Sequence, residues 1–132
     1  MSKRALQIAV AIGGIVPVAG GLGGMVLGAA LAGGVSGNAD LDSHFRYLSG
    51  LLLGIGLAFW STIPGIERKG DLFRILTAIV VLGGLGRLSS IFFYNLPGNP
   101  MIAALGMELV VTPLLCLWQA RVASRDVTRA YA

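Results

Sequence analysis

The chain has 132 residues, of which 55% are hydrophobic and only 12% are charged, and its mean hydropathy is +0.81. A soluble domain has about 25% charged residues, so the composition excludes an ordinary soluble protein and predicts an integral membrane protein. The net charge of +4 does not indicate a nucleic-acid-binding protein, because the basic residues flank apolar segments, where contact with anionic membrane lipids explains them.

Four apolar segments follow one another along the chain, and each is close to the ~20 residues that a membrane-spanning helix needs. A chain in hydrocarbon must satisfy its own backbone hydrogen bonds, so these segments are expected to be helices, with irregular chain only between them. We therefore predict an all-α fold, a four-helix transmembrane bundle that forms one integral membrane domain over residues 1–132. The predicted helices cover residues 5–31, 45–63, 72–93 and 101–119.

The first segment is rich in glycine. It is longer than the ~7 to 15 apolar residues of a secretory signal, so we expect it to remain as a first helix. Gly20, Gly24 and Gly28 recur at every fourth residue and form a ridge of small residues at which another helix can approach closely. Gly50 and Gly54 form a second ridge in the second segment. The partner is open: a helix of this chain, a second copy of the chain, or a flat ligand.

Basic residues flank the four segments almost entirely on one side. By the positive-inside rule this side is cytoplasmic, so both termini are predicted to lie in the cytoplasm. Arg46, at the start of the second segment, is the exception on the other side. The basic residues on the predicted cytoplasmic side are Lys3, Arg4, Arg68, Lys69, Arg74, Arg121, Arg125 and Arg129.

Two ionisable side chains lie deep within the last two segments. Arg87 is seven residues before Tyr94, and Glu108 is seven residues after Met101, so the two side chains flank the same short connection of a hairpin. At ~1.5 Å per helical residue, both lie about 10 Å from the same membrane surface. Because an isolated charge at this depth is costly, we predict a bidentate ion pair between Arg87 and Glu108.

Arg46 lies about one turn inside the second segment, and we predict that it is the third member of a polar cluster at this level. Asp42, four residues before Arg46, is the predicted N-cap of the second helix. With two arginines and one glutamate, the cluster would keep a positive charge that an anionic headgroup, a carboxylate or a quinone-like carbonyl could complete. Three roles are open for the cluster: helix register, ligand recognition, and a path for protons or ions. Its further candidate members are His44, Tyr47, Ser49 and Ser90.

Catalytic and metal-binding motifs are absent from the sequence. The glycine-rich run from Gly83 to Gly86 follows an apolar helix pattern and not a strand, so it predicts close helix packing beside Arg87 and not a phosphate loop. The chain has one histidine, His44, and one cysteine, Cys116, which leaves no ligand set for a haem or a multi-cysteine metal site. We therefore predict no enzymatic activity and no metal, and the only bound molecule we expect is a lipid or a quinone.

Several short runs occur in a fixed order along the chain: His44-Phe45-Arg46-Tyr47-Leu48-Ser49-Gly50, Leu72-Phe73-Arg74, Gly83-Gly84-Leu85-Gly86-Arg87-Leu88, Glu108-Leu109 and Pro113. This order resembles a bacterial family of small four-helix membrane proteins that is catalogued as a domain of unknown function. In size and layout the chain is also similar to the DoxX-like group of membrane proteins. The resemblance implies a bacterial inner-membrane protein and leaves the activity unassigned.

Two functional hypotheses follow from these features. The leading one is a non-enzymatic accessory or assembly subunit of a membrane complex, in which a protein partner or a second copy of the chain packs on the glycine ridges. The alternative is binding or transport of an amphipathic ligand, a lipid or a quinone-like molecule, in a polar pocket around Arg46, Arg87 and Glu108.

Overall fold

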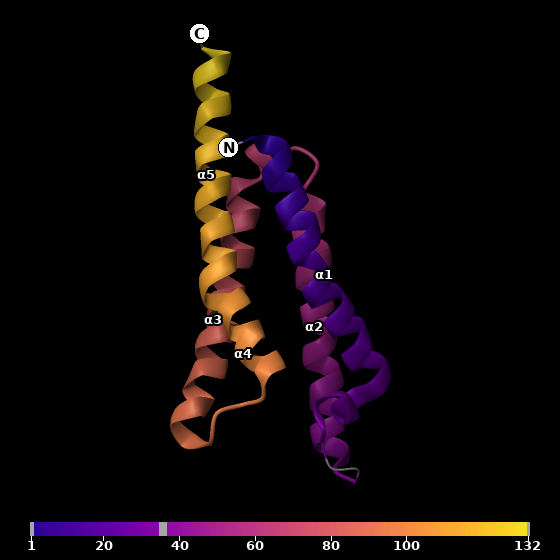
Figure 1. Ribbon diagram of the computed structural model, residues 1–132. Helices are drawn as coiled ribbons and strands as arrows, with labels where there is room; N and C mark the ends of the chain where they lie inside the picture. The colour runs from indigo at the N-terminus through magenta and orange to yellow at the C-terminus, as the bar shows by residue number, and fades with distance from the viewer. Residues whose placement is uncertain (1, 35–36, 132) are drawn as a thin grey trace. The chain divides into compact units, whose positions relative to one another are not determined.

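The computed structural model describes residues 2–34 and 37–131. In these ranges the chain is all-α and has no strand, which confirms the predicted fold class. A π-helical segment (Met107–Val111) joins α4 to α5 without a break, so the described chain contains four long helical runs, as predicted. A short 3₁₀ helix follows α1 (Gly28–Ala32) and another precedes α3 (Ile66–Arg68). The helices drawn in Figure 1 are α1 (Lys3–Leu27), α2 (Ala39–Thr62), α3 (Gly70–Phe93), α4 (Asn99–Gly106) and α5 (Thr112–Ala130).

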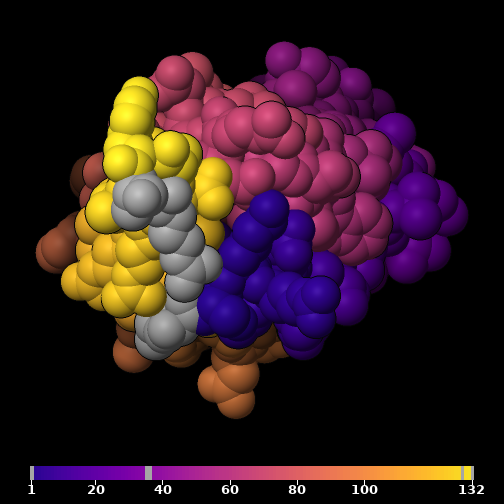
Figure 2. All heavy atoms as spheres, turned by 90° about the horizontal axis from the view of Figure 1, so that it is seen from above, coloured from indigo at the N-terminus to yellow at the C-terminus, as the bar shows by residue number. Residues whose placement is uncertain are grey.

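Two of the predicted helix ends are wrong. The second helix begins at Ala39 and not at residue 45, because the side chain of Asn38, and not that of Asp42, accepts the backbone N–H of Leu41 and caps the helix. The last run continues past residue 119 to Ala130, since no glycine or proline follows to end it. The exposed last turns of α5 are yellow in Figure 2. The structure does not describe the side chain of Arg129.

Three runs of the described chain are long and apolar enough to cross a membrane. They are Lys3–Ala32, Gly70–Phe93 and Asn99–Thr128. The helix α2 is not among them, and its first two turns carry two aspartates, a histidine and an arginine. Crossing by α2 therefore stays a prediction, whereas the membrane-spanning character of the other three runs agrees with the sequence.

The chain divides into two compact units. Unit 1 contains residues 1–7 and 64–132, and unit 2 contains residues 8–63. Each unit is built around an antiparallel hairpin of helices (Figure 1). In unit 1, α3 lies beside the α4–α5 run. In unit 2, the part of α1 from Ile8 onward lies beside α2. The prediction of a single domain concerns the whole chain and stays a prediction.

The small core of unit 1 lies at the end of the hairpin where α3 begins. Phe73 and Ile66 are fully buried, and so is the polar side chain of Gln119 on α5. Gln119 Nε2 donates to the backbone carbonyl of Ile66 at 2.8 Å. Gly70 lies against the same amide group: a Cβ there would be 3.4 Å from Gln119 Nε2. This contact joins the start of α3 to α5 on the side opposite to the connection between α3 and α4.

The N-terminal residues of unit 1 are held by an ion pair. Lys3 Nζ lies 2.8 Å from Glu67 Oε2, and the Glu67 side chain is only 8% exposed. The pKa of Glu67 is lowered from its ordinary value, first by the contact with the Lys3 ammonium and then by its own backbone N–H, and these outweigh the opposing effect of burial.

The Glu67 carboxylate is expected to make unit 1 sensitive to acid. Because the folded-state pKa is lowered, the stabilisation is fully present above the unfolded pKa of about 4.3 and is lost as the pH falls through the lower folded value. Glu67→Gln should lower the thermal midpoint by about 4 °C at pH 7, and this deficit should shrink as the pH falls below the unfolded pKa of about 4.3. A deficit that keeps the same size as the pH falls would show that the ionised carboxylate is not the cause.

In unit 2, glycines allow the backbones of α1 and α2 to approach closely. Gly14 lies against the indole of Trp60, whose Nε1 donates to the carbonyl of Ala11 at 3.1 Å. A Cβ at Gly21 would lie 2.5 Å from the backbone nitrogen of Leu53. The remaining close contacts are those of Gly24 with Ser49, Gly28 with Asp42 and Arg46, and Gly56 with Val18 and Pro17.

The contact between α1 and α2 is displaced from the predicted ridges. Gly24 and Gly28 lie in it, but a Cβ at Gly20 would come no closer than 3.9 Å to Leu52. A Cβ at Gly50 would come no closer than 3.6 Å to Met25, and Gly54 has nothing within 4 Å. The contact residues Gly14, Gly21 and Gly28 instead recur at every seventh position, which is the repeat that keeps one helix facing another.

Candidate functional site

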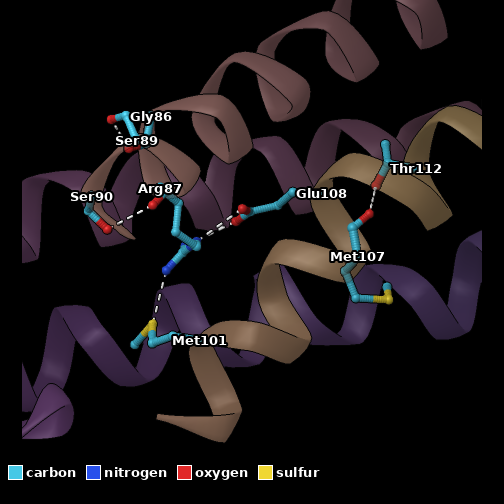
Figure 3. Close-up of polar contacts among 8 residues, drawn as sticks. All are labelled: Gly86, Arg87, Ser89, Ser90, Met101, Met107, Glu108 and Thr112. Atoms are coloured by element: carbon cyan, nitrogen blue, oxygen red, sulfur yellow. Dashed lines mark hydrogen bonds and ion pairs between the residues drawn. The ribbon is translucent and has the colours of Figure 1, made fainter. Parts of the chain in front are cut away.

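The candidate site is the ion pair between Arg87 on α3 and Glu108 in the π-helical segment. Arg87 Nε donates to Glu108 Oε2 at 3.0 Å, and Arg87 Nη2 donates to Glu108 Oε1 at 3.0 Å. The side chains point toward each other across the hairpin (Figure 3) and are 32% and 17% exposed. The predicted pair is therefore present and bidentate, the geometry in which a guanidinium and a carboxylate bind most strongly.

A local change of helix geometry presents Glu108 to Arg87. Pro113 has no backbone N–H to donate to the carbonyl one turn earlier, and the neighbouring Thr112 Oγ1 donates to the carbonyl of Met107 at 2.8 Å. Both features favour the wider turn seen from Met107 to Val111. Single π-helical turns occur frequently at functional sites, so this turn is a second reason to regard the ion pair as the candidate site.

Gly84 allows the two helices to approach at the level of the ion pair. A Cβ at Gly84 would lie 2.7 Å from Leu109 Cδ2 and 2.9 Å from Glu108 Cβ. Gly83 and Gly86 have nothing within 4 Å. The predicted close packing beside Arg87 therefore depends on Gly84, and its two neighbouring glycines face open space.

We expect Gly84→Ala to lower the free energy of unfolding by about 2 kcal/mol, because the new methyl group overlaps Leu109 and Glu108. Gly83→Ala is the matched control: it meets no atom, and alanine is the better helix former by about 1 kcal/mol. Reversible unfolding in mixed detergent micelles measures both. Equal effects of the two substitutions would contradict close packing at Gly84.

The guanidinium of Arg87 has donors that Glu108 does not use. Arg87 Nη1 donates to the thioether of Met101, with 2.9 Å between nitrogen and sulfur. The nearby Ser89 and Ser90 hydroxyl groups donate to the carbonyls of Gly86 and Arg87 on their own helix (Figure 3). Ser90 thus lies beside the pair, as predicted, but its hydroxyl proton is used by the backbone.

Arg46 belongs to unit 2 and has a carboxylate partner of its own. Its Nε donates to Asp42 Oδ2 at 2.8 Å, and its Nη1 donates to the carbonyls of Met25 and Val26 at the end of α1. Asp42 Oδ1 accepts the backbone N–H of Ala29 at 2.9 Å. Arg46 and Asp42 together therefore cap the end of α1. The prediction of a surplus positive charge at Arg46 is wrong, because Asp42 neutralises the guanidinium of Arg46.

This clamp depends on the backbone at Gly28, where φ is +64°. A side chain at this position would be strained and would meet Asp42 and Arg46. Asp42 thus binds Arg46 through one carboxylate oxygen and the N–H of Ala29 through the other.

The other predicted members of the cluster also belong to unit 2. Ser49 is buried, and its hydroxyl donates to the carbonyl of Phe45 at 2.7 Å while the side chain packs against Gly24. The exposed rings of His44 and Tyr47 lie in a tilted contact with 6.4 Å between their centroids. A cluster that unites these residues with Arg87 and Glu108 stays a prediction.

Asp42 and Met101 contact the arginines of the predicted site, but the sequence predicted Asp42 only as a helix cap and predicted no role for Met101. The spacing of Asp42 and Arg46, four residues apart on one helix, is a signal for their pairing. The contact of Met101 with Arg87 leaves no such signal in the sequence. Among residues 2–34 and 37–131, no three histidine, cysteine, aspartate or glutamate side chains gather as a metal site.

Comparison with known proteins places the chain in a family without assigning an activity. No curated protein and no solved structure matches the chain. The chain matches the family described as a domain of unknown function, DUF4345, over residues 5–119. This match covers all four predicted helices and agrees with the resemblance found in the sequence. The chain therefore belongs to the DUF4345 family.

Proposed function

We propose that this protein is a non-enzymatic accessory or assembly subunit that acts by association with another protein in the membrane. The observation that carries the proposal is that glycines on exposed helix faces are left open. Among the described residues of their own units, Gly54 on α2, and Gly83 and Gly86 on α3, have no atom within 4 Å of the position of a Cβ. Small residues at such positions let a second helix backbone come close in lipid.

The two arginines in the apolar part of the chain support the same proposal. Each is held within its own unit, Arg87 by Glu108 and Arg46 by Asp42 and the end of α1. Such contacts fix helix order and register. We infer that these charges stabilise the helices and that the open glycine faces carry the association.

We further propose that the protein lies in the bacterial inner membrane with four crossings and both termini in the cytoplasm. The basic residues support this topology, because those at the start of α1, around the start of α3 and in the second half of α5 would all lie on the same side of such a bundle. An even number of crossings requires α2 to span the membrane as well. Its paired Asp42 and Arg46 lie in its first two turns, near the membrane surface, where charges cost least.

Mild detergent extraction from native membranes followed by native mass spectrometry tests the association. We expect species heavier than the 13.7 kDa chain, either multiples of it or complexes with a second protein. Replacing Gly54 with leucine should remove these species, because the larger side chain holds a partner helix away. A persistent monomer without any co-purifying protein would contradict the proposal.

A second candidate function is the binding of an amphipathic ligand at Arg87. The specific observation in its favour is that Arg87 Nη1 contacts only a thioether among the described residues, although it lies within a membrane-spanning run. Thioethers are weak acceptors. A ligand oxygen at this position would satisfy the guanidinium better than the protein itself does.

A further inference from the structure

The contact between Arg87 and Met101 places a weak acceptor where an oxygen atom fits. An N–H···O hydrogen bond has about 2.7–3.2 Å between its heavy atoms, and Met101 Sδ lies 2.9 Å from Arg87 Nη1. Glu108 already occupies Nε and Nη2. The side of the guanidinium that faces Met101 is therefore the side on which an added acceptor can bind.

The charge of the site selects the kind of acceptor. Arg87 is neutralised by Glu108, so the ion pair carries no net charge. An anion at Nη1 would be repelled by the Glu108 carboxylate on the same guanidinium, and this repulsion is strong where water is scarce. A neutral carbonyl oxygen meets the same donor without that repulsion.

Met101 can move aside to admit such a ligand. It lies in the first turn of α4, a helix of eight residues, and its side chain is unbranched and flexible. The Arg87 side chain is 32% exposed, so the guanidinium can be reached. Ser89 and Ser90 do not compete for a ligand carbonyl, because their hydroxyl groups donate to their own helix.

We propose that a carbonyl oxygen of a neutral amphipathic molecule accepts a hydrogen bond from Arg87 Nη1 at the position of the Met101 thioether. The molecule is a quinone, or a zwitterionic phospholipid that offers an ester carbonyl. This inference rests on the second candidate function, ligand binding at Arg87. It adds that the acceptor is a neutral carbonyl oxygen and that the ligand displaces the side chain of Met101.

Native mass spectrometry of the delipidated full-length protein tests the inference with three probes: a short-chain ubiquinone, a phosphatidylcholine and oleate. We expect one neutral probe to bind in preference to oleate, and its identity separates the quinone from the phospholipid. Met101→Leu should tighten binding of this probe about 3- to 10-fold, because no thioether competes for Nη1. Met107→Leu is the matched control, since the Met107 side chain points away from Arg87 (Figure 3), and it should have no effect.

Two further variants test the donor and the charge. Arg87→Lys keeps the charge but lacks the planar guanidinium, and it should weaken binding about 10-fold or more. Glu108→Gln leaves Arg87 unneutralised and should shift the preference from the neutral probe to oleate. Each variant is first compared with the parent protein in thermal unfolding, so that a loss of fold is not mistaken for a loss of the ligand.

The results separate the inference from the function on which it rests. A parent protein that binds none of the three probes contradicts both. Binding that is equal in Met101→Leu and Met107→Leu but weakened in Arg87→Lys overturns the displacement of Met101 and keeps ligand binding at Arg87. Binding that survives in Arg87→Lys contradicts both the inference and ligand binding at Arg87. A parent protein that prefers oleate overturns the choice of a neutral carbonyl.

Discussion

Glu108→Ala is expected to lower the free energy of unfolding by about 3 kcal/mol. The substitution leaves the Arg87 guanidinium, in a run apolar enough to span a membrane, without the carboxylate that holds its Nε and Nη2. Removal of one partner of a buried ion pair costs about 3–5 kcal/mol, and the lower value applies here because the Arg87 side chain is one-third exposed and can reach toward the membrane surface. Reversible unfolding in mixed micelles of detergent and sodium dodecyl sulfate measures the change.

The double variant Arg87→Met, Glu108→Leu shows whether the loss comes from the unpaired charge. Replacing both members by apolar side chains of similar size is often neutral, so this variant should recover most of the stability that Glu108→Ala loses. A double variant as unstable as Glu108→Ala would show that the pair does not act through its charges.

Gly21→Ala is expected to have the second-largest effect, about 3 kcal/mol, through the contact between α1 and α2. A Cβ at Gly21 would lie 2.5 Å from the nitrogen of Leu53 and 2.7 Å from the carbonyl oxygen of Ser49. Both are backbone atoms of α2, which cannot move aside as a side chain can, so the cost lies at the upper end of the range for overpacking.

Gly20→Ala is the matched control for Gly21→Ala. The two glycines are adjacent in the same helix, but a Cβ at Gly20 would meet only the side chain of Leu52 at 3.9 Å. We expect no loss of stability at Gly20, since alanine is the better helix former. Unfolding in mixed micelles compares the two variants directly, and a larger loss at Gly20 would place the packing face where the four-residue spacing predicted it.

The Arg87–Glu108 pair could be predicted because only a few quantities determine it. A short connection makes α3 and the last run an antiparallel hairpin, and the constant rise of a helix fixes the depth of each residue. Two charges at equal depth in such a hairpin then have strong reason to pair. The π-helical turn does not affect this reasoning, because it changes the direction of Glu108 more than its depth.

The partner of Arg46 and the packing face of α1 could not be predicted from the sequence. The position of Asp42 suits both a helix cap and an ion pair with Arg46, and the sequence does not distinguish the two contacts. The glycines of α1 occur on several faces, so a four-residue spacing through Gly20 and a seven-residue spacing through Gly21 are both present. The side chains of α2 decide which of the two glycine faces packs against it, and these side chains are distant from α1 in the sequence.

Photo-crosslinking in intact membranes tests the proposed association most directly. A photoreactive side chain at Leu57 or Leu82, each within one turn of an open glycine and 50% or 68% exposed, should form a discrete adduct with a protein. The control is Ile8, which is 60% exposed but more than one turn from any glycine. The proposal predicts protein adducts at the first two positions and lipid adducts alone at Ile8. Lipid adducts alone at all three positions, with no species heavier than the 13.7 kDa chain and its bound lipid, would contradict it.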